Sequence, residues 1–228
     1  MRVTGARGSF ATDRVTGAVL AVRTAMRPDQ YPEPLSQSAE EHSRVASDYL
    51  VRSGVPTSEV SGTHVTTTMA GGMSRDGKLA PWSQRLLWYS THLERSVGGV
   101  PVEGSFAFAA LDTSGAAITE GVYWPSIPAD VVARAQELSR RLGSPDTRAS
   151  FFEPVLKAHP EIDKAAGTVK IVHTSAGYPG RFEVQAVYSV IVRNPNRGKA
   201  KTLRFDGSGA RVVLGDERAT GADSPKTR

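Results

Sequence analysis

Twice along the sequence, one amphipathic helical stretch precedes a series of short β-rich stretches. The first helical stretch begins at Ser38, where the sequence has a capping-box pattern, and ends at Gly54. The second begins at Pro128, a residue tolerated in the first helical turn, and ends at Gly143. This order predicts an α+β protein of two units, each consisting of a helix packed on an antiparallel β-meander.

The β-rich stretches are separated by Gly, Pro, Asp or Ser residues, which favour turns. In the first unit we expect strands at about 60–69, 84–97, 102–112 and 116–124. In the second unit we expect them at about 167–175, 182–193, 199–206 and 210–214. A short apolar segment, Phe151 to Leu156, is expected to pack under the second helix. A further hairpin is predicted between Phe10 and Val22.

The two units resemble each other in their spacing. Their helix starts, and their turns at Asp112 and Asp206, lie at nearly the same separation along the chain. This indicates a diverged internal duplication, although strands joined by Asp/Gly turns also recur in unrelated sheets. The predicted organisation is an N-terminal hairpin and linker at 1–37, a first unit at 38–124, a second unit at 125–215 and a mobile polar tail at 216–228.

The composition excludes several classes of protein. A hydrophobic fraction of 39% with 22% charged residues is typical of a globular chain and not of a disordered one. The absence of cysteine excludes disulfides, thiolate metal sites and cysteine nucleophiles. A net charge of +5, spread over the chain, does not predict nucleic-acid binding. The sequence has no apolar run that predicts a membrane span and no apolar segment typical of a secretory signal.

A distinctive hairpin pattern connects the expected strands at 84–97 and 102–112. Gly98 and Gly99 permit the backbone angles of a tight connection. Pro101 stops further ladder pairing, and Gly104 suits a bulge or a close approach. These residues predict a structural hairpin and not a ligand contact. Gly99→Val is therefore expected to destabilise the first unit, and Arg95→Ala to do much less.

This hairpin, together with the Asp112–Gly115 turn, resembles the cystatin-like propeptide domain found ahead of thermolysin-type and fungalysin-type peptidases. The resemblance covers about residues 10–124. In the second unit, the Tyr188–Val190 and Leu203–Asp206 segments resemble the related PepSY-type domains. The resemblance implies two cystatin-like units, an extracytoplasmic location and binding to another protein, with no catalytic residues. Because the chain lacks the His-Glu-x-x-His motif of those peptidases, the implied role is that of a stand-alone peptidase inhibitor or propeptide-like regulator.

Motifs that suggest catalysis have simpler structural interpretations. Asp112 and Asp206 each precede a glycine by three positions, which is the spacing of a β-turn and not that of an aspartic protease. The histidines are scattered without metal-binding spacing, although His64 and His92 fall on adjacent expected strands and can meet across the sheet. We therefore expect no catalytic residue, metal or cofactor, and a protein that is not an enzyme. An unrecognised hydrolase is one alternative.

The expected function is the binding of another protein, a peptidase or an acidic surface. Trp88 and Tyr89 are candidate interface anchors wherever they reach the solvent face. A basic cluster at an expected hairpin end is a candidate contact for an acidic partner and consists of Arg193, Arg197, Lys199 and Lys201. The alternative for this cluster is a charged edge that resists aggregation. The alternative function is self-association as a structural or assembly component.

Overall fold

The computed structural model describes residues 2–5, 8–12, 19–22, 32–71, 85–158, 167–173, 184–193 and 200–213, so the predicted polar tail lies outside the described residues. Within these ranges, three α-helices and a mostly antiparallel set of strands confirm the α+β class. The chain forms two compact units. The first comprises Met1–Arg95 and Ser105–Pro125, and the second comprises Ser96–Gly104 and Ser126–Arg228. The segment 96–104 therefore belongs to the second unit, although the chain on either side of it belongs to the first.

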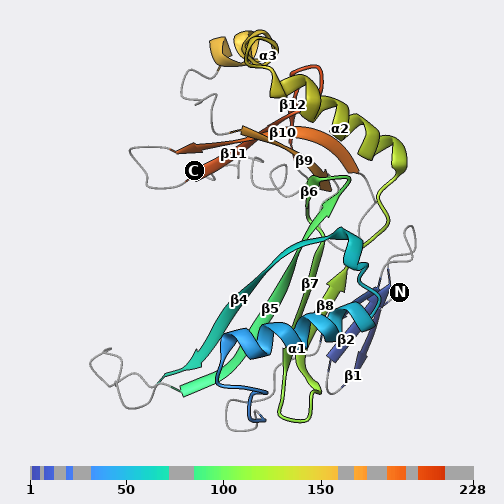
Figure 1. Cartoon of the computed structure of the whole chain (residues 1–228), viewed down its shortest axis with the longest axis vertical. Coiled ribbons are helices and arrows are strands. Elements are labelled where there is room, and N and C mark those ends of the chain that lie inside the picture. Colours follow the sequence, from blue (N-terminus) through green and yellow to red (C-terminus); the bar gives the residue numbers. More distant parts are fainter. Residues whose placement is uncertain are drawn as a thin grey trace, which may run out of the picture. The chain divides into compact units, whose positions relative to one another are not determined.

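The first unit packs helix α1 (Ala39–Arg52) on one face of a four-stranded antiparallel sheet (Figure 1). The strand order is β4–β5–β7–β8. The strands are β4 (Val60–Ala70), β5 (Arg85–Val97), β7 (Phe106–Leu111) and β8 (Ala117–Tyr123). The buried residues Ala46 and Leu50 of α1 share a core with Ala107 and Ala109 of β7, whose small side chains let the helix lie close to the sheet.

The start of α1 confirms part of the capping-box prediction. The Ser38 side chain accepts a hydrogen bond of 3.4 Å from the Glu41 backbone N–H. The Glu41 carboxylate, however, accepts from the Ser36 hydroxyl at 2.7 Å, and that hydroxyl accepts from the Ser38 N–H at 2.9 Å. The hydroxyl of Ser36 thus bridges the two groups that pair directly in a capping box. A short 3₁₀ turn, η2 (Thr57–Glu59), then leads into β4.

A separate three-stranded sheet precedes α1 in the first unit. It consists of β1 (Arg2–Gly5), β2 (Gly8–Thr12) and β3 (Val19–Val22) in the order β1–β2–β3. The antiparallel pairing of β2 with β3 confirms the hairpin predicted between Phe10 and Val22. Strand β3 lies beside β8.

The second unit packs two helices, α2 (Ala129–Gly143) and α3 (Pro145–Ala158), around a core shared with its own sheet. The strand order is β12–β11–β10–β9–β6. The strands are β6 (Val100–Glu103), β9 (Gly167–His173), β10 (Val184–Arg193), β11 (Ala200–Phe205) and β12 (Arg211–Val212). The predicted apolar stripe of α2 is buried, and its members are Val131, Ala135, Leu138 and Leu142.

Helix α3 is a feature that the sequence interpretation missed. Pro145 lies two residues after Gly143, the predicted end of α2, and it begins α3, because proline is compatible with the first turn of a helix. Arg148 of α3 donates a 2.7 Å hydrogen bond to the Leu142 carbonyl, so α3 provides a partner for a backbone carbonyl in the last turn of α2. Within the segment expected to pack under α2, Phe152 is fully buried in the shared core.

The hairpin at 98–104 also differs from expectation. The strand expected at 102–112 is split at Gly104, whose φ of +93° permits the break. Its first part, β6, pairs in parallel with β9 through Val102 and Ile171. Val100 and Val102 are buried in the second core, which explains why the hairpin belongs to the second unit. Each unit has a helix, antiparallel strands and an Asp turn, and an internal duplication stays a prediction.

Candidate interaction surface

Strand β4 forms one edge of the first sheet (Figure 1). It is 11 residues long, and across the described part of the chain β5 is the strand that pairs with it. The sequence of β4 contains no Asp, Glu, Lys, Arg or Pro. Its register with β5 is irregular at Val60/Gly62 and at Thr68/Met69, so the ladder is regular from Gly62 to Thr68. This is a long, uncharged strand edge, a type that natural proteins usually protect.

Most side chains of β4 are exposed on one or other face of the sheet. The exposed residues are Ser61, Thr63, His64, Thr66, Thr67 and Met69. Met69 is 50% exposed, which is unusual for a large hydrophobic side chain among the described residues. The β-branched threonines explain why this polar segment is a strand, since Thr favours extended backbone. We refer to the unpaired side of β4 as the β4 edge.

A row of aromatic rings lies beside this edge, on the face of the sheet opposite α1. His64 and His92 are direct cross-strand partners, and their rings stack at 4.8 Å with an interplanar angle of 3°. His92 also stacks on Phe108 at 5.3 Å. The Thr66 Oγ1 atom lies 3.1 Å from His92 Nε2. The prediction that the two histidines meet across the sheet is confirmed.

The protonation state of His92 follows from its surroundings. Burial lowers the pKa of His92, and the proximity of His64 lowers it further, because a proton on one imidazole opposes a proton on the other. The Glu94 carboxylate lies 3.6 Å from His64 Nδ1 at an exposed position. Beside the β4 edge, a neutral His92 is therefore favoured near pH 7.

A third histidine, His42, has a structural role on the α1 side of the sheet. It is fully buried, and its Nδ1 lies 2.9 Å from the Thr91 hydroxyl. Its Nε2 accepts the Leu111 backbone N–H at 3.2 Å, so the proton of the neutral ring must sit on Nδ1. Burial lowers the pKa of His42. The sequence carried a signal for this burial, since His42 shares a helical face with Ala46 and Leu50.

A buried ion pair fixes the point where β4 begins. The Arg95 side chain is 1% exposed, and its Nη2 lies 2.7 Å from the Glu59 carboxylate. The same carboxylate accepts the Trp124 indole N–H at 2.9 Å, and the Arg95 guanidinium lies 4.9 Å from the Trp124 ring centroid. Because Glu59 directly precedes β4, this cluster ties the start of β4 to β5 and β8.

The predicted interface anchors lie on opposite faces of the first sheet. Tyr89 is half-buried, faces α1 and donates a 2.9 Å hydrogen bond to the Gln37 carbonyl. Trp88 is also half-buried and points to the other face, since successive side chains of a strand alternate. The described residues therefore do not bring these two side chains together.

The basic cluster is largely outside the described residues. Arg197 and Lys199 lie in the gap between β10 and β11. The backbones of Arg193 and Lys201 belong to the facing ends of those paired strands, as the hairpin prediction required. The positions of their side chains lie outside the described part as well.

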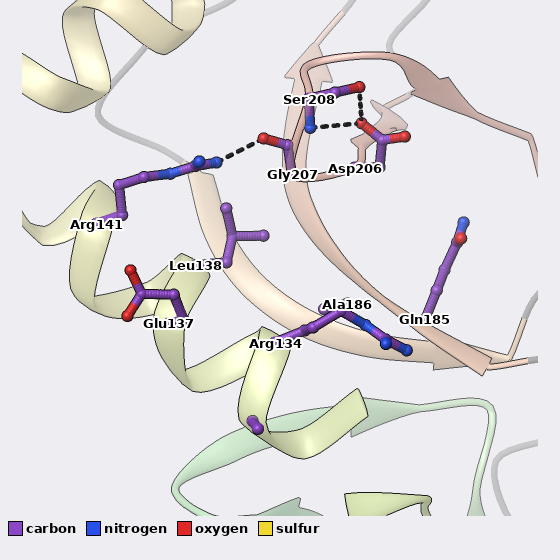
Figure 2. A pocket seen from close by; sticks show the side chains of 10 residues that line it. Arg134, Glu137, Leu138, Arg141, Gln185, Ala186, Asp206, Gly207 and Ser208 are labelled. Atoms are coloured by element: carbon purple, nitrogen blue, oxygen red, sulfur yellow. Dashed lines mark hydrogen bonds between the residues drawn. The ribbon is translucent and has the colours of Figure 1, made fainter. Parts of the chain in front are cut away.

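The second unit contains a cavity of about 740 Å³ between α2, β10 and the turn after β11 (Figure 2). Arg141 reaches across it and donates a 2.5 Å hydrogen bond to the Gly207 carbonyl. Glu137 pairs with Arg140 on the outside of the helix, and the Asp206 carboxylate is engaged by Ser208. These contacts hold the turn and the helix in place, and the Asp206–Ser208 pair belongs to the turn itself.

Both Asp turns have the predicted β-turn geometry. The Gly115 N–H donates to the Asp112 carbonyl at 2.9 Å, and the Gly209 N–H donates to the Asp206 carbonyl at 3.0 Å. Each carboxylate also accepts a serine hydroxyl at 2.6 Å. Slight burial raises the pKa of each carboxyl, but the hydrogen bonds outweigh this and hold it below its usual range. The interpretation as turns is confirmed.

Comparison with known proteins leaves the chain without an assigned relative. No family model, curated protein or solved structure matches it. Among the described residues, no group of three or more His, Cys, Asp or Glu side chains is placed to hold a metal ion. The helices of the described ranges are all too short or too polar to cross a membrane.

Proposed function

We propose that this protein is a non-catalytic polypeptide-binding module that adds an extended segment of another chain to the β4 edge. The observation that carries the proposal is the length and composition of that edge. Within the described residues it is paired on one side, and it has neither charge nor proline. Such an edge presents a row of backbone N–H and C=O groups that can extend the sheet by one strand.

The side chains of β4 would contact those of the added strand and so give selectivity. Val65 lies between Thr63 and Thr67 on one face of β4, while His64 and Thr66 lie on the other. An added strand would place alternate side chains beside each set. Backbone hydrogen bonds would then supply affinity, and the threonine and histidine side chains would supply selectivity.

The resemblance to cystatin-like propeptide domains supports a peptidase as one partner class. In that case the protein acts as a stand-alone inhibitor or propeptide-like regulator. The basic residues Arg193, Arg197, Lys199 and Lys201 would add a contact for an acidic surface, which mainly increases the rate of association.

Two matched proline variants test the proposal. Consecutive residues of a strand direct their N–H groups to opposite sides, so one of Thr66→Pro and Thr67→Pro removes an outward N–H and the other removes a ladder hydrogen bond to β5. A thermal melt identifies the ladder variant by its lower melting temperature. The other variant should keep the parent melt and lose a partner captured from an extract of the source cells. Thr113→Lys, on an exposed turn, should retain that partner. If the partner survives both proline changes, binding does not use the β4 edge.

A further inference from the structure

We infer that a second copy of this chain occupies the β4 edge when no other partner is present, with the two β4 strands paired antiparallel about Val65. This inference rests on the proposed function, because it names the first strand that the edge would accept. The resulting dimer would join two first-unit sheets into one. Each copy would protect the edge that the other leaves open.

The regular part of β4 is centred on Val65. The register with β5 is regular from Gly62 to Thr68, between the two irregular positions. An antiparallel pair that uses this whole segment places Val65 opposite its own copy and Thr63 opposite Thr67 of the other copy. It also places His64 opposite Thr66, the same chemistry as the 3.1 Å contact between Thr66 and His92 within one copy. Every pair across such an interface is therefore compatible.

The lack of charge on β4 favours an uncharged strand, such as that of a second copy. The net charge of +5 on the whole chain opposes self-association only weakly, because it is spread over the chain and acts at long range. The β4 strand itself carries no Lys, Arg, Asp or Glu, so no like charges face each other at the interface. An exposed sheet edge usually carries a lysine or a proline that prevents such pairing, and β4 contains neither.

The other sheet edges in the described part of the chain do not offer the same surface. Strand β8 lies beside β3, and β12 is two residues long and begins with an arginine. Strand β6 pairs with the end of β5 as well as with β9. Within the described ranges, the β4 edge is the one that combines length with a lack of charge. A second copy is therefore expected to meet the first through β4.

The first experiment introduces charges at two of the exposed threonines, Thr63 and Thr67. In the proposed register, Thr63→Lys combined with Thr67→Lys places two lysines directly opposite each other at two points of the dimer. The matched variant, Thr63→Lys combined with Thr67→Glu, places a lysine opposite a glutamate at the same points. In sedimentation velocity of the full chain, the parent should dimerise. The first variant should weaken dimerisation by at least about tenfold, and the second should restore it.

The second experiment tests the register by disulfide cross-linking, since the natural chain has no cysteine. Val65→Cys should form a covalent dimer on oxidation, because the introduced thiol of one copy faces the same thiol of the other copy. Thr63→Cys and Thr67→Cys should each cross-link poorly alone and well when mixed. Thr113→Cys measures the background from random collision. A parent that sediments as a monomer, or cross-linking by Thr113→Cys equal to that by Val65→Cys, would overturn the inference.

These outcomes are separate from those of the proposed function. One outcome is a monomeric parent that loses its captured partner when the outward N–H of β4 is removed. This result would support the polypeptide-binding function and contradict the second copy as the occupant. A dimer that the lysine pair does not weaken would place self-association elsewhere on the molecule and would also reject the inference.

Discussion

The two units use similar elements, yet they treat the edges of their sheets in opposite ways. In the second unit, β6 covers one edge of β9, and the sheet ends at the two-residue strand β12, which begins with Arg211. In the first unit, β4 extends for 11 residues with no charged residue. Short strands and positive charges are common ways to prevent unwanted pairing. The comparison supports the proposal that association through a sheet edge uses the first unit.

The supports of the two edges also differ. The start of β4 is held by the buried pair of Arg95 and Glu59. Strand β6 is held by backbone pairing with β9 and by Glu103, which forms ion pairs with Lys170 at 3.2 Å and with the nearly buried Arg204. Burial alone would raise the pKa of Glu103, but the hydrogen bonds and positive charges of Arg204 and Lys170 outweigh it and lower the pKa. Changes to one support should therefore move the melting transition of one unit.

The largest effect is expected for Arg95→Ala. Removing a buried ion-pair partner typically costs about 3–5 kcal/mol, and we expect about 3 kcal/mol because Glu59 is 26% exposed and can be rehydrated. In differential scanning calorimetry, Arg95→Ala should lower the melting temperature of the first unit. The proposed binding at the β4 edge should weaken as that unit unfolds. This reverses the expectation from sequence that Arg95→Ala is mild. A melt unchanged from the parent would show that the pair adds nothing.

Gly98→Val should be next and should act on the second unit. The φ of Gly98 is +58°, and a Cβ there would lie 2.6 Å from Gln136 Nε2 and 2.9 Å from Val132 Cγ1 on α2. We expect a loss of about 1–3 kcal/mol from backbone strain, with the steric contact adding to it. Gly99, at φ +79°, has open space around it, so Gly99→Val should cost the strain alone.

The unit whose melting temperature falls shows which core the hairpin at 98–104 stabilises. Sequence reasoning assigned the effect of Gly99→Val to the first unit, but the hairpin packs in the second core. In calorimetry, Gly98→Val should therefore shift the transition of the second unit, and in sedimentation velocity it should leave the proposed dimerisation through the β4 edge unchanged. A shift confined to the first unit would contradict the placement of the hairpin.

Acidification should weaken the first unit by a smaller amount. Burial lowers the pKa of His42 below 6.5 in the folded state, so the unfolded chain takes up a proton first as the pH falls. The contribution of His42 to stability is complete above pH 6.5 and decreases as the pH falls toward the folded-state pKa. His92 changes in the same direction. Urea unfolding at a series of pH values should show this loss, and His42→Gln should reduce the slope. A slope identical to that of the parent would contradict the assignment.

The smallest effects are expected at the two Asp turns, which serve as a matched pair. Asp112→Ala and Asp206→Ala each remove the acceptor for one serine hydroxyl and two backbone N–H groups at an exposed turn. We expect a cost of about 1 kcal/mol for each. Chemical denaturation should show nearly equal losses, the first variant in the first unit and the second in the second. Strongly unequal losses would mean that one turn has a further contact.

The sequence was sufficient for most local features and insufficient for long-range ones. The boundaries of α1 and α2, the Asp turns and several antiparallel hairpins follow from periodicity and turn chemistry between near neighbours, whereas α3 was missed because Pro145 was not recognised as a helix start. The parallel pairing of Val102 with Ile171 joins residues far apart in the chain, and no local pattern encodes it. Arg95 appeared to be an ordinary strand charge because its partner Glu59 lies in an earlier turn.

The candidate surface was visible in part. The absence of charge and proline across 60–70 can be read from the sequence, but whether that strand lies at an edge depends on the topology of the sheet. The meeting of His64 and His92 was predictable because their strands are sequential neighbours in the fold. The predicted anchors Trp88 and Tyr89 could not be placed together, since adjacent residues of one strand face opposite ways.

The membership of 96–104 in the second unit sets an order of events during synthesis. The hairpin leaves the ribosome before the last strands of the first unit, β7 and β8, yet its parallel partner β9 is made much later. Until Gly167–His173 has been translated, the buried valines of β6 have no second core to enter. A first unit that folded during synthesis would therefore do so around a hairpin without its partner, and a chain truncated after Pro125 would leave Val100 and Val102 without the core that buries them.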